Sequence, residues 1–179
     1  ILLFLFLFQF GIRAHDLPPI QNFSMSDYGA GSQNWSISQD SDKNIYFGNN
    51  AGLLEFNGSR WKLYTTPNGT IIRSVKVIED TIYTGFYMDF GFWHKDVFGD
   101  FHYTSLLDKL NLPLIEDEHF WNITSRDEWI LFQSLDRIYM YNTSTEKIDV
   151  IEFETNRAMI FNLEEGIFVQ SPGKGLFML

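Results

Sequence analysis

An internal repeat runs through the 179-residue sequence. Four short apolar stretches, each with the composition of a β-strand, end at Gly48, Gly85, Gln133 and Gln170, which are 37, 48 and 37 residues apart. A second strand-like stretch precedes each of them, and a short polar segment joins the two, at residues 40–44, 79–80, 125–128 and 164–166. Two strands that flank such a segment favour a β-hairpin. The repeat therefore predicts a fold built from similar β units placed one after another.

Further strand-like stretches follow each predicted hairpin. The third stretch lies at 52–56, 90–93, 137–141 and 175–178, and a fourth lies at 61–64, 101–104 and 148–153 in the first three units. Four short antiparallel strands that recur about every 40 residues are typical of a β-propeller blade. We expect an all-β chain with blades at 33–67, 68–115 and 116–157 and an incomplete blade at 158–179. These would be about 3.5 blades of a larger, seven-bladed propeller, since propellers usually close with four to eight blades.

Composition narrows the classes of function. Aromatic residues make up 17% of the chain, including 18 Phe, and such flat side chains suit the packing between neighbouring sheets. The chain has no Cys, which excludes disulfides, cysteine-based zinc or iron–sulfur sites and cysteine nucleophiles. Its formal net charge of −10 argues against a surface that grips nucleic-acid phosphates. We therefore expect no direct nucleic-acid binding by this chain.

The first residues have the pattern of an export signal. Residues 1–10 hold a single polar side chain, Gln9, and are too few to cross a bilayer of ~30 Å as a helix. They fit the apolar region of a partial signal peptide at 1–14, and the alternatives are a buried strand or core helix and an uncleaved membrane anchor. Residues 15–32 are expected to form a lead-in segment. Because the last strand-like stretch runs to the final residue, we expect the natural protein to be longer.

One aromatic segment is the candidate ligand site. Residues 86–93 join the second and third strands of the second unit, where propeller loops often face a ligand. Aromatic rings beside a carboxylate suit stacking on a sugar or another flat ligand. The predicted ligand-binding residues are Tyr87, Asp89, Phe90 and Trp93. Packing between blades is the alternative for the same rings.

Two polar segments have some of the residue types of a metal site. Residues 40–44 place Asp and Asn at alternate positions, as calcium loops do, but Ile45 and Ala51 stand where such a loop has Gly and Glu. A hairpin turn is therefore favoured there. The acidic run 116–119 favours a solvated loop between blades over a carboxylate pair or a metal site. We predict no catalytic, metal or cofactor site in this chain.

Residues 34–64, which read NWSISQDSDKNIYFGNNAGLLEFNGSRWKLY, resemble the propeller repeat of bacterial two-component-type sensors. Residues 69–74 and 90–93 resemble the Bacteroidetes branch of that family, and the resemblance covers about residues 20–179, with Gln in place of the strand-ending Gly in the third and fourth units. It implies a signal peptide, a periplasmic propeller sensor, a triple-tyrosine immunoglobulin-like domain and a transmembrane helix. It also implies a cytoplasmic output outside this chain, either a LuxR-type helix-turn-helix or a histidine kinase.

These features predict the periplasmic, ligand-sensing part of a membrane-spanning protein that transduces signals and regulates transcription. The expected partner is an extracellular ligand, with a glycan as one candidate; a homodimer and membrane attachment through a helix outside this chain are further expectations. The alternatives are an exported propeller enzyme of the lyase, glycosidase or quinoprotein type and a propeller that binds proteins. An enzyme would need converging charged residues, and only Asp89 and Arg73 are visible candidates. We therefore expect no enzyme activity from this chain.

Overall fold

Four antiparallel β-sheets follow one another along the chain in the computed structural model, which describes residues 20–153 and 157–179. The predicted signal peptide at 1–14 lies outside these residues. In each sheet the strands are hydrogen-bonded to one another in chain order. Consecutive strands are therefore joined by short turns, as the hairpin pattern predicts.

Among the described residues, the first three sheets have four strands each and the fourth has three. The first two sheets contain β1 (Asn34–Gln39), β2 (Ile45–Asn49), β3 (Gly52–Phe56), β4 (Trp61–Tyr64), β5 (Ile72–Ile78), β6 (Thr81–Phe86), β7 (Asp89–Lys95) and β8 (Phe101–Ser105). The last two contain β9 (Asn122–Arg126), β10 (Trp129–Gln133), β11 (Arg137–Asn142), β12 (Ile148–Glu152), β13 (Met159–Leu163), β14 (Gly166–Ser171) and β15 (Gly175–Met178). A short 3-10 helix, η1 (Leu107–Lys109), lies between β8 and β9.

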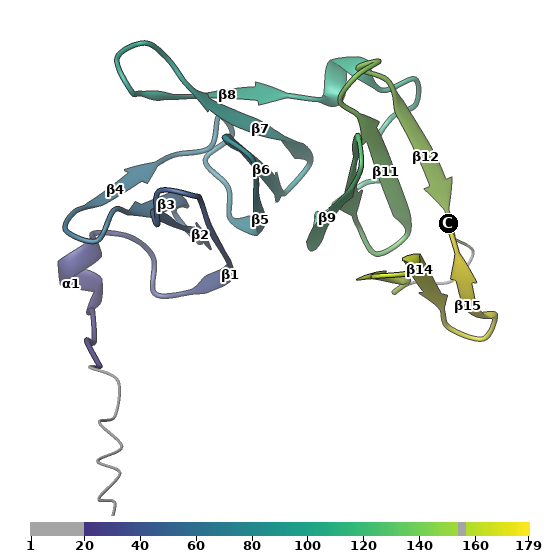
Figure 1. Cartoon of the computed structure of the whole chain (residues 1–179), viewed down its shortest axis with the longest axis horizontal. Helices are drawn as coiled ribbons and strands as arrows, with labels where there is room; N and C mark the ends of the chain where they lie inside the picture. The colour runs from purple at the N-terminus through teal and green to yellow at the C-terminus, as the bar shows by residue number, and fades with distance from the viewer. Residues whose placement is uncertain (1–19, 154–156) are drawn as a thin grey trace, which may run out of the picture.

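The first strands of successive sheets are neighbours: β1 contacts β5, β5 contacts β9 and β9 contacts β13. Figure 1 shows the sheets along an arc, with β4, β8 and β12 towards its outer side. Sheets that radiate from their first strands in this way are the blades of a β-propeller. The predicted fold class, an all-β propeller-like chain, is confirmed.

The hydrophobic core is divided into layers between neighbouring sheets. Tyr46 and Trp93 lie in the layer between the first and second sheets, and Phe90, Phe132 and Tyr139 lie in the layer between the second and third. The buried side chains of the third layer are aliphatic. Since a middle strand is covered on both faces, β6 is almost continuously buried. The expectation that aromatic side chains pack between blades is confirmed.

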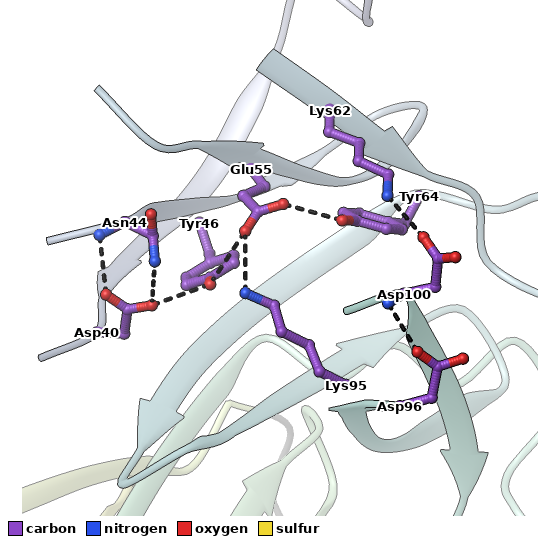
Figure 2. A network of polar contacts seen from close by, with 9 residues as sticks. All are labelled: Asp40, Asn44, Tyr46, Glu55, Lys62, Tyr64, Lys95, Asp96 and Asp100. Atoms are coloured by element: carbon purple, nitrogen blue, oxygen red, sulfur yellow. Dashed lines mark hydrogen bonds and ion pairs between the residues drawn. The ribbon is translucent and has the colours of Figure 1, made fainter. Parts of the chain in front are cut away.

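A polar network ties the first sheet to the second (Figure 2). The buried carboxylate of Glu55 on β3 accepts hydrogen bonds from the Tyr64 hydroxyl at 2.9 Å and from the Lys95 amine of β7 at 3.4 Å. The Tyr46 hydroxyl lies between Glu55 and Asp40, 3.3 and 3.0 Å from their carboxylate oxygens. Burial and the nearby Glu55 carboxylate raise the pKa of Tyr46, so its hydroxyl remains a donor. Because Lys95 comes from the neighbouring sheet, the network connects two blades through charge-assisted hydrogen bonds.

The segment 40–44 is a hairpin turn, as predicted. One carboxylate oxygen of Asp40 accepts the backbone N–H of Asn44 at 2.8 Å, and the other accepts its side-chain amide at 2.8 Å. Lys43 takes the left-handed conformation that closes the turn, with φ of 71°. Both oxygens of Asp40 are therefore used by the turn that joins β1 to β2.

A short helix, α1 (Met25–Tyr28), lies within the predicted lead-in segment. Its first turn is closed by the Asp27 carboxylate, which accepts the backbone N–H of Ser24 at 2.6 Å. Phe23 packs edge-on against Trp61 of β4, with ring centroids 5.2 Å apart. This contact seats the lead-in on the last strand of the first sheet. No helix in the described part of the chain has the length and apolar character needed to cross a membrane.

Candidate functional site

The four predicted ligand-binding residues lie in different environments, and two of them are core residues. Phe90 and Trp93, both on β7, are 0% and 3% exposed. The Phe90 ring centroid is 4.6 Å from that of Phe120 and 4.7 Å from that of Phe132. The indole N–H of Trp93 donates to Thr84 Oγ1 at 2.8 Å. Neither ring has a face left for a ligand, so the stacking interpretation does not fit these two residues and the packing alternative does.

Asp89 and Tyr87 lie nearer the surface. The Asp89 carboxylate, at the start of β7, accepts a hydrogen bond from the Ser105 hydroxyl at 2.7 Å, and burial raises its pKa. Tyr87 lies in the turn between β6 and β7 and donates its hydroxyl proton to Asp117 at 2.6 Å. Of the four predicted residues, Tyr87 is the one that joins the surface cluster around Trp121.

Three residues occupy equivalent positions at the start of the first strand of three successive sheets: Trp35, Arg73 and Trp121. Each precedes a residue that pairs with the end of the second strand; the pairs are Ser36–Gly48, Ser74–Gly85 and Asn122–Gln133. Trp35 and Arg73 lie where the pairing register shifts, which marks a β-bulge in β1 and in β5. A bulge redirects the side chain that it carries. Together these three residues form what we call the Trp–Arg–Trp site.

The guanidinium of Arg73 lies against both indole rings. Its Cζ atom is 4.0 Å from the ring centroid of Trp35 and 4.8 Å from that of Trp121, which is within cation–π range. The centroids of the two indole rings are 6.2 Å apart, and the angle between the ring planes is 76°. Trp35 is 43% exposed and Trp121 is 39% exposed. The site therefore presents a cation flanked by aromatic surface that solvent can reach.

The Arg73 side chain has hydrogen-bonding capacity to spare. Its Nε and Nη1 atoms are buried and have no hydrogen-bond partner among the described residues. Burial lowers the pKa of Arg73, yet an arginine remains charged at neutral pH. A buried donor without an acceptor costs about 1–3 kcal/mol. A ligand acceptor would remove that cost, and it reaches these two atoms once the guanidinium or a flanking indole ring moves aside.

The turn between β2 and β3 fixes the position of Trp35. The indole N–H of Trp35 donates to Asn50 Oδ1 at 2.7 Å, and the Asn50 amide donates to Gln33 Oε1 at 3.1 Å. The neighbouring Asn49 is fully buried and bonds the backbone of Gly31 twice, accepting its N–H at 2.9 Å and donating to its carbonyl at 2.7 Å. The start of β1 is therefore held in place before any ligand binds.

His119 and Tyr87 extend the aromatic surface. The His119 ring centroid is 5.7 Å from that of Trp121 and 5.0 Å from that of Tyr87. Tyr87 and His119 are also joined by an antiparallel β-bridge. Nδ1 of His119 is buried and has no hydrogen-bond partner within the described ranges. A continuous row of rings thus runs from Trp35 to Tyr87.

The acidic run 116–119 is solvated only in part. Its first two residues are exposed, whereas Glu118 is 5% exposed. The Glu118 carboxylate accepts the hydroxyl of Tyr139 at 2.8 Å and the backbone N–H of Ile115 at 2.9 Å. The solvated-loop interpretation is therefore wrong for Glu118, which anchors this segment to the third sheet.

Two shallow hollows flank the Trp–Arg–Trp site. One of about 250 Å³ is lined by Trp35, its neighbours on β1 and Phe47 of β2. The other, of about 80 Å³, is lined by Trp121, His119 and four acidic residues, Glu116, Asp117, Glu118 and Asp136. A further hollow of about 400 Å³ lies between the first two sheets, where Asp40 and Lys95 are already bonded to protein groups. The Trp–Arg–Trp site is the stronger candidate because unbonded donors lie beside exposed rings.

His119 is expected to titrate below its usual value of 6.5. Burial and the nearby Arg73 charge lower the pKa of His119. Because the folded state then binds this proton less readily than the unfolded state, the associated stability is complete above pH 6.5 and falls as the pH drops below it. NMR titration of the imidazole Cε1–H signal measures this pKa. Arg73→Gln should move it back towards 6.5, and titration of the unchanged chain at or above 6.5 would contradict the described surroundings.

Sequence reasoning did not select Trp35 or Trp121. It considered His119 only as part of the acidic run 116–119 and Arg73 only as an isolated charge. A signal for the site was nevertheless present in the repeat. Trp35, Arg73 and Trp121 lie 13, 12 and 12 residues before the strand ends that define the repeat. Aligning the units on those ends places Arg73 and Trp121 at one position of the blade and Trp35 one residue before it.

Comparison with known proteins gives no family. No family model matches the chain, and no curated protein matches it.

Solved structures match it in fold. One match is the extracellular domain of BT4673 from B. thetaiotaomicron, which is described as belonging to a one-component system in one structure and to a hybrid two-component system in another. It matches with a TM-score of 0.58 at 17% identity, over 83% of this chain and 22% of that one. The extracellular domain of BT3049 from the same organism, described as a hybrid two-component system, matches with a TM-score of 0.55 at 13% identity, over 89% of this chain and 30% of that one.

A computationally designed protein, Ika4, matches with a TM-score of 0.60 at 6% identity, over 83% of this chain and 91% of that one. The chain thus spans about a fifth to a third of the length of the two B. thetaiotaomicron domains. At these identities the likeness establishes a shared fold.

Proposed function

We propose that this chain is the ligand-sensing part of an exported, membrane-anchored signalling protein. The observation that carries the proposal is the Trp–Arg–Trp site, in which unbonded donors of a cation lie between two exposed indole rings. The likeness in fold to extracellular domains described as one- and two-component systems supports a sensing role. The export pattern of residues 1–14 supports a periplasmic location. A transmembrane helix, a cytoplasmic output and homodimer formation stay predictions from the sequence.

The site is built to couple binding to the arrangement of the blades. Trp35 belongs to the first sheet, Arg73 to the second, and Trp121 immediately precedes the third. A ligand that contacts all three would favour the relative sheet positions in which these contacts are made together. A ligand that binds one arrangement of the sheets more tightly than another shifts the equilibrium between them, and a sensor can transmit a signal through that shift.

A glycan is the ligand class that the site favours. The flat, apolar face of a sugar ring stacks on an indole ring, and its hydroxyls accept hydrogen bonds from donors such as Arg73. The hollows beside Trp35 and Trp121 leave both rings accessible from solvent. We infer that the ligand binds across these rings and that the chain itself catalyses no reaction on it.

A thermal-shift and calorimetric screen against neutral and acidic oligosaccharides tests this function. At least one glycan should raise the melting temperature of the chain, and Trp35→Ala or Trp121→Ala should weaken its binding at least tenfold, a loss of about 1.4 kcal/mol. Phe98→Ala is the matched control, because Phe98 is 88% exposed at the tip between β7 and β8, away from the site. The site is wrong if a glycan binds all variants equally, and the glycan-sensing function is rejected if no member of the screen binds.

A further inference from the structure

We propose that the ligand of the Trp–Arg–Trp site is an acidic sugar whose carboxylate binds Arg73, an inference that rests on the proposed function. The starting observation is the combination of a charged side chain and missing acceptors. Arg73 keeps Nε and Nη1 out of water without giving either an acceptor among the described residues. An uncompensated cation in such a position is unfavourable until an anion reaches it.

The chemistry of the donor selects the anion. Planar guanidinium groups pair with carboxylates through parallel N–H···O bonds, and these charge-assisted bonds are about twice as strong as neutral ones. A neutral sugar hydroxyl offers an acceptor but leaves the charge uncompensated. A uronate supplies both the acceptor and the charge.

The surroundings of Arg73 place the rest of the ligand. The guanidinium lies 4.0 and 4.8 Å from the two ring centroids, so a carboxylate that reaches it brings its own sugar ring against indole surface. The nearby carboxylate of Asp117 is held by the Tyr87 hydroxyl at 2.6 Å. His119 has its pKa lowered by burial and by the Arg73 charge, and the other ionisable groups in the hollow beside Trp121 are carboxylates, so none of them offers a second cation to an acidic ligand. Arg73 is therefore the group that recognises charge in this row of rings.

The net charge of the chain makes this site selective. A formal charge of −10 repels anions from most of the surface. An acidic ligand consequently gains only where a cation is left unpaired, and long-range attraction does not draw it to other places.

The test compares acidic oligosaccharides with their carboxyl-reduced counterparts by isothermal titration calorimetry. The probes are trisaccharides of galacturonate, glucuronate, mannuronate and guluronate, the same sugars after carboxyl reduction, and sulfated galactose oligosaccharides. At least one uronate should bind, and its reduced form should bind at least tenfold more weakly. Arg73→Gln should weaken the acidic probe roughly 30-fold and leave the reduced probe within about threefold, since hydrogen bonds to charged groups carry most of the difference.

A conservative variant separates charge from geometry. Arg73→Lys keeps the charge but loses the planar fork and its stacking on the indoles, so its affinity for the uronate should lie between those of the unchanged chain and Arg73→Gln. The urea midpoint of each variant shows that it is folded before binding is compared.

The outcomes distinguish carboxylate recognition by Arg73 from the proposed glycan-sensing function. If reduced sugars bind at the Trp35 and Trp121 rings as well as uronates do, or if only sulfated sugars bind, the carboxylate inference fails and the sensing function stands. A uronate preference that survives Arg73→Gln also overturns the inference. If no oligosaccharide of either kind binds, both fail.

Discussion

Phe90→Ala is expected to lower the free energy of unfolding by about 4 kcal/mol, the range for truncating a buried phenylalanine. The ring is 0% exposed and lies between the second and third sheets. Its centroid is 4.6 Å from that of Phe120, 4.7 Å from that of Phe132 and 5.1 Å from that of Tyr139. Removing it leaves a cavity walled by three rings, two on the third sheet and that of Phe120 in the segment before β9, which cannot all move inward to fill it. Urea unfolding of the purified chain, followed by tryptophan fluorescence, measures the change.

Phe98→Ala makes the same chemical change in the same sheet. Because Phe98 is 88% exposed, its removal should alter the free energy of unfolding by less than about 0.5 kcal/mol. The contrast decides the role of the aromatic segment 86–93. If Phe90→Ala were as stable as Phe98→Ala, the ring would not be part of the core and its earlier interpretation as a ligand-binding residue would regain force.

The sequence repeat was sufficient to predict the strands. The stretches expected at 52–56 and 61–64 coincide with β3 and β4, and each later unit has its strands in the predicted order. Strand-forming residues and polar turns are local features, so they can be recognised in short stretches of the sequence. The helix α1 was missed, because four residues held by a capping contact leave no hydrophobic period to detect.

The position of the site could not be predicted in the same way. Along β6 and β7, both faces are covered by neighbouring sheets, so apolar residues no longer alternate with polar ones and the pattern does not say which ring is buried. Tyr87 and Phe90 look alike in the sequence, yet one lies in a turn near the surface and the other between sheets. The nearness of Trp35 to Trp121, 6.2 Å between ring centroids, depends on how three blades stack. That information lies between repeat units rather than within one.

Gly85→Ala is expected to lower the free energy of unfolding by about 3 kcal/mol, the upper part of the range for overpacking. A Cβ atom at Gly85 would lie 2.5 Å from the Cβ of Phe120, 2.7 Å from the hydroxyl of Ser74 and 3.1 Å from the carbonyl of Phe120. These groups are fixed, since the Ser74 hydroxyl donates to that carbonyl at 2.9 Å. The clash would displace the residue that precedes Trp121, so binding at the Trp–Arg–Trp site should weaken together with stability.

The third blade has Gln133 at the position that Gly85 occupies in the second blade, and the comparison shows why Gly85 has no room for a side chain. At the equivalent register position Gln133 fills the space, and its amide donates to the carbonyl of Ala158 while its oxygen accepts the backbone N–H of Ile160 at 3.3 Å. The segment that leads into the next sheet therefore lies close to the strand where this position is Gly, and is separated from it by the side chain where the position is Gln.

Gly166→Ala is the control for the Gly85 substitution, since the nearest atoms to an added Cβ there belong to the flexible Met178 side chain, at 3.3 and 3.4 Å. It should change the free energy of unfolding by no more than about 0.5 kcal/mol, because that side chain can rotate away. Equal urea midpoints for the two alanine variants would show that the second and third blades are not in the close contact described. A large loss for Gly85→Ala alone would show that the spacing between these blades, and with it the position of Trp121, depends on the absence of one methyl group.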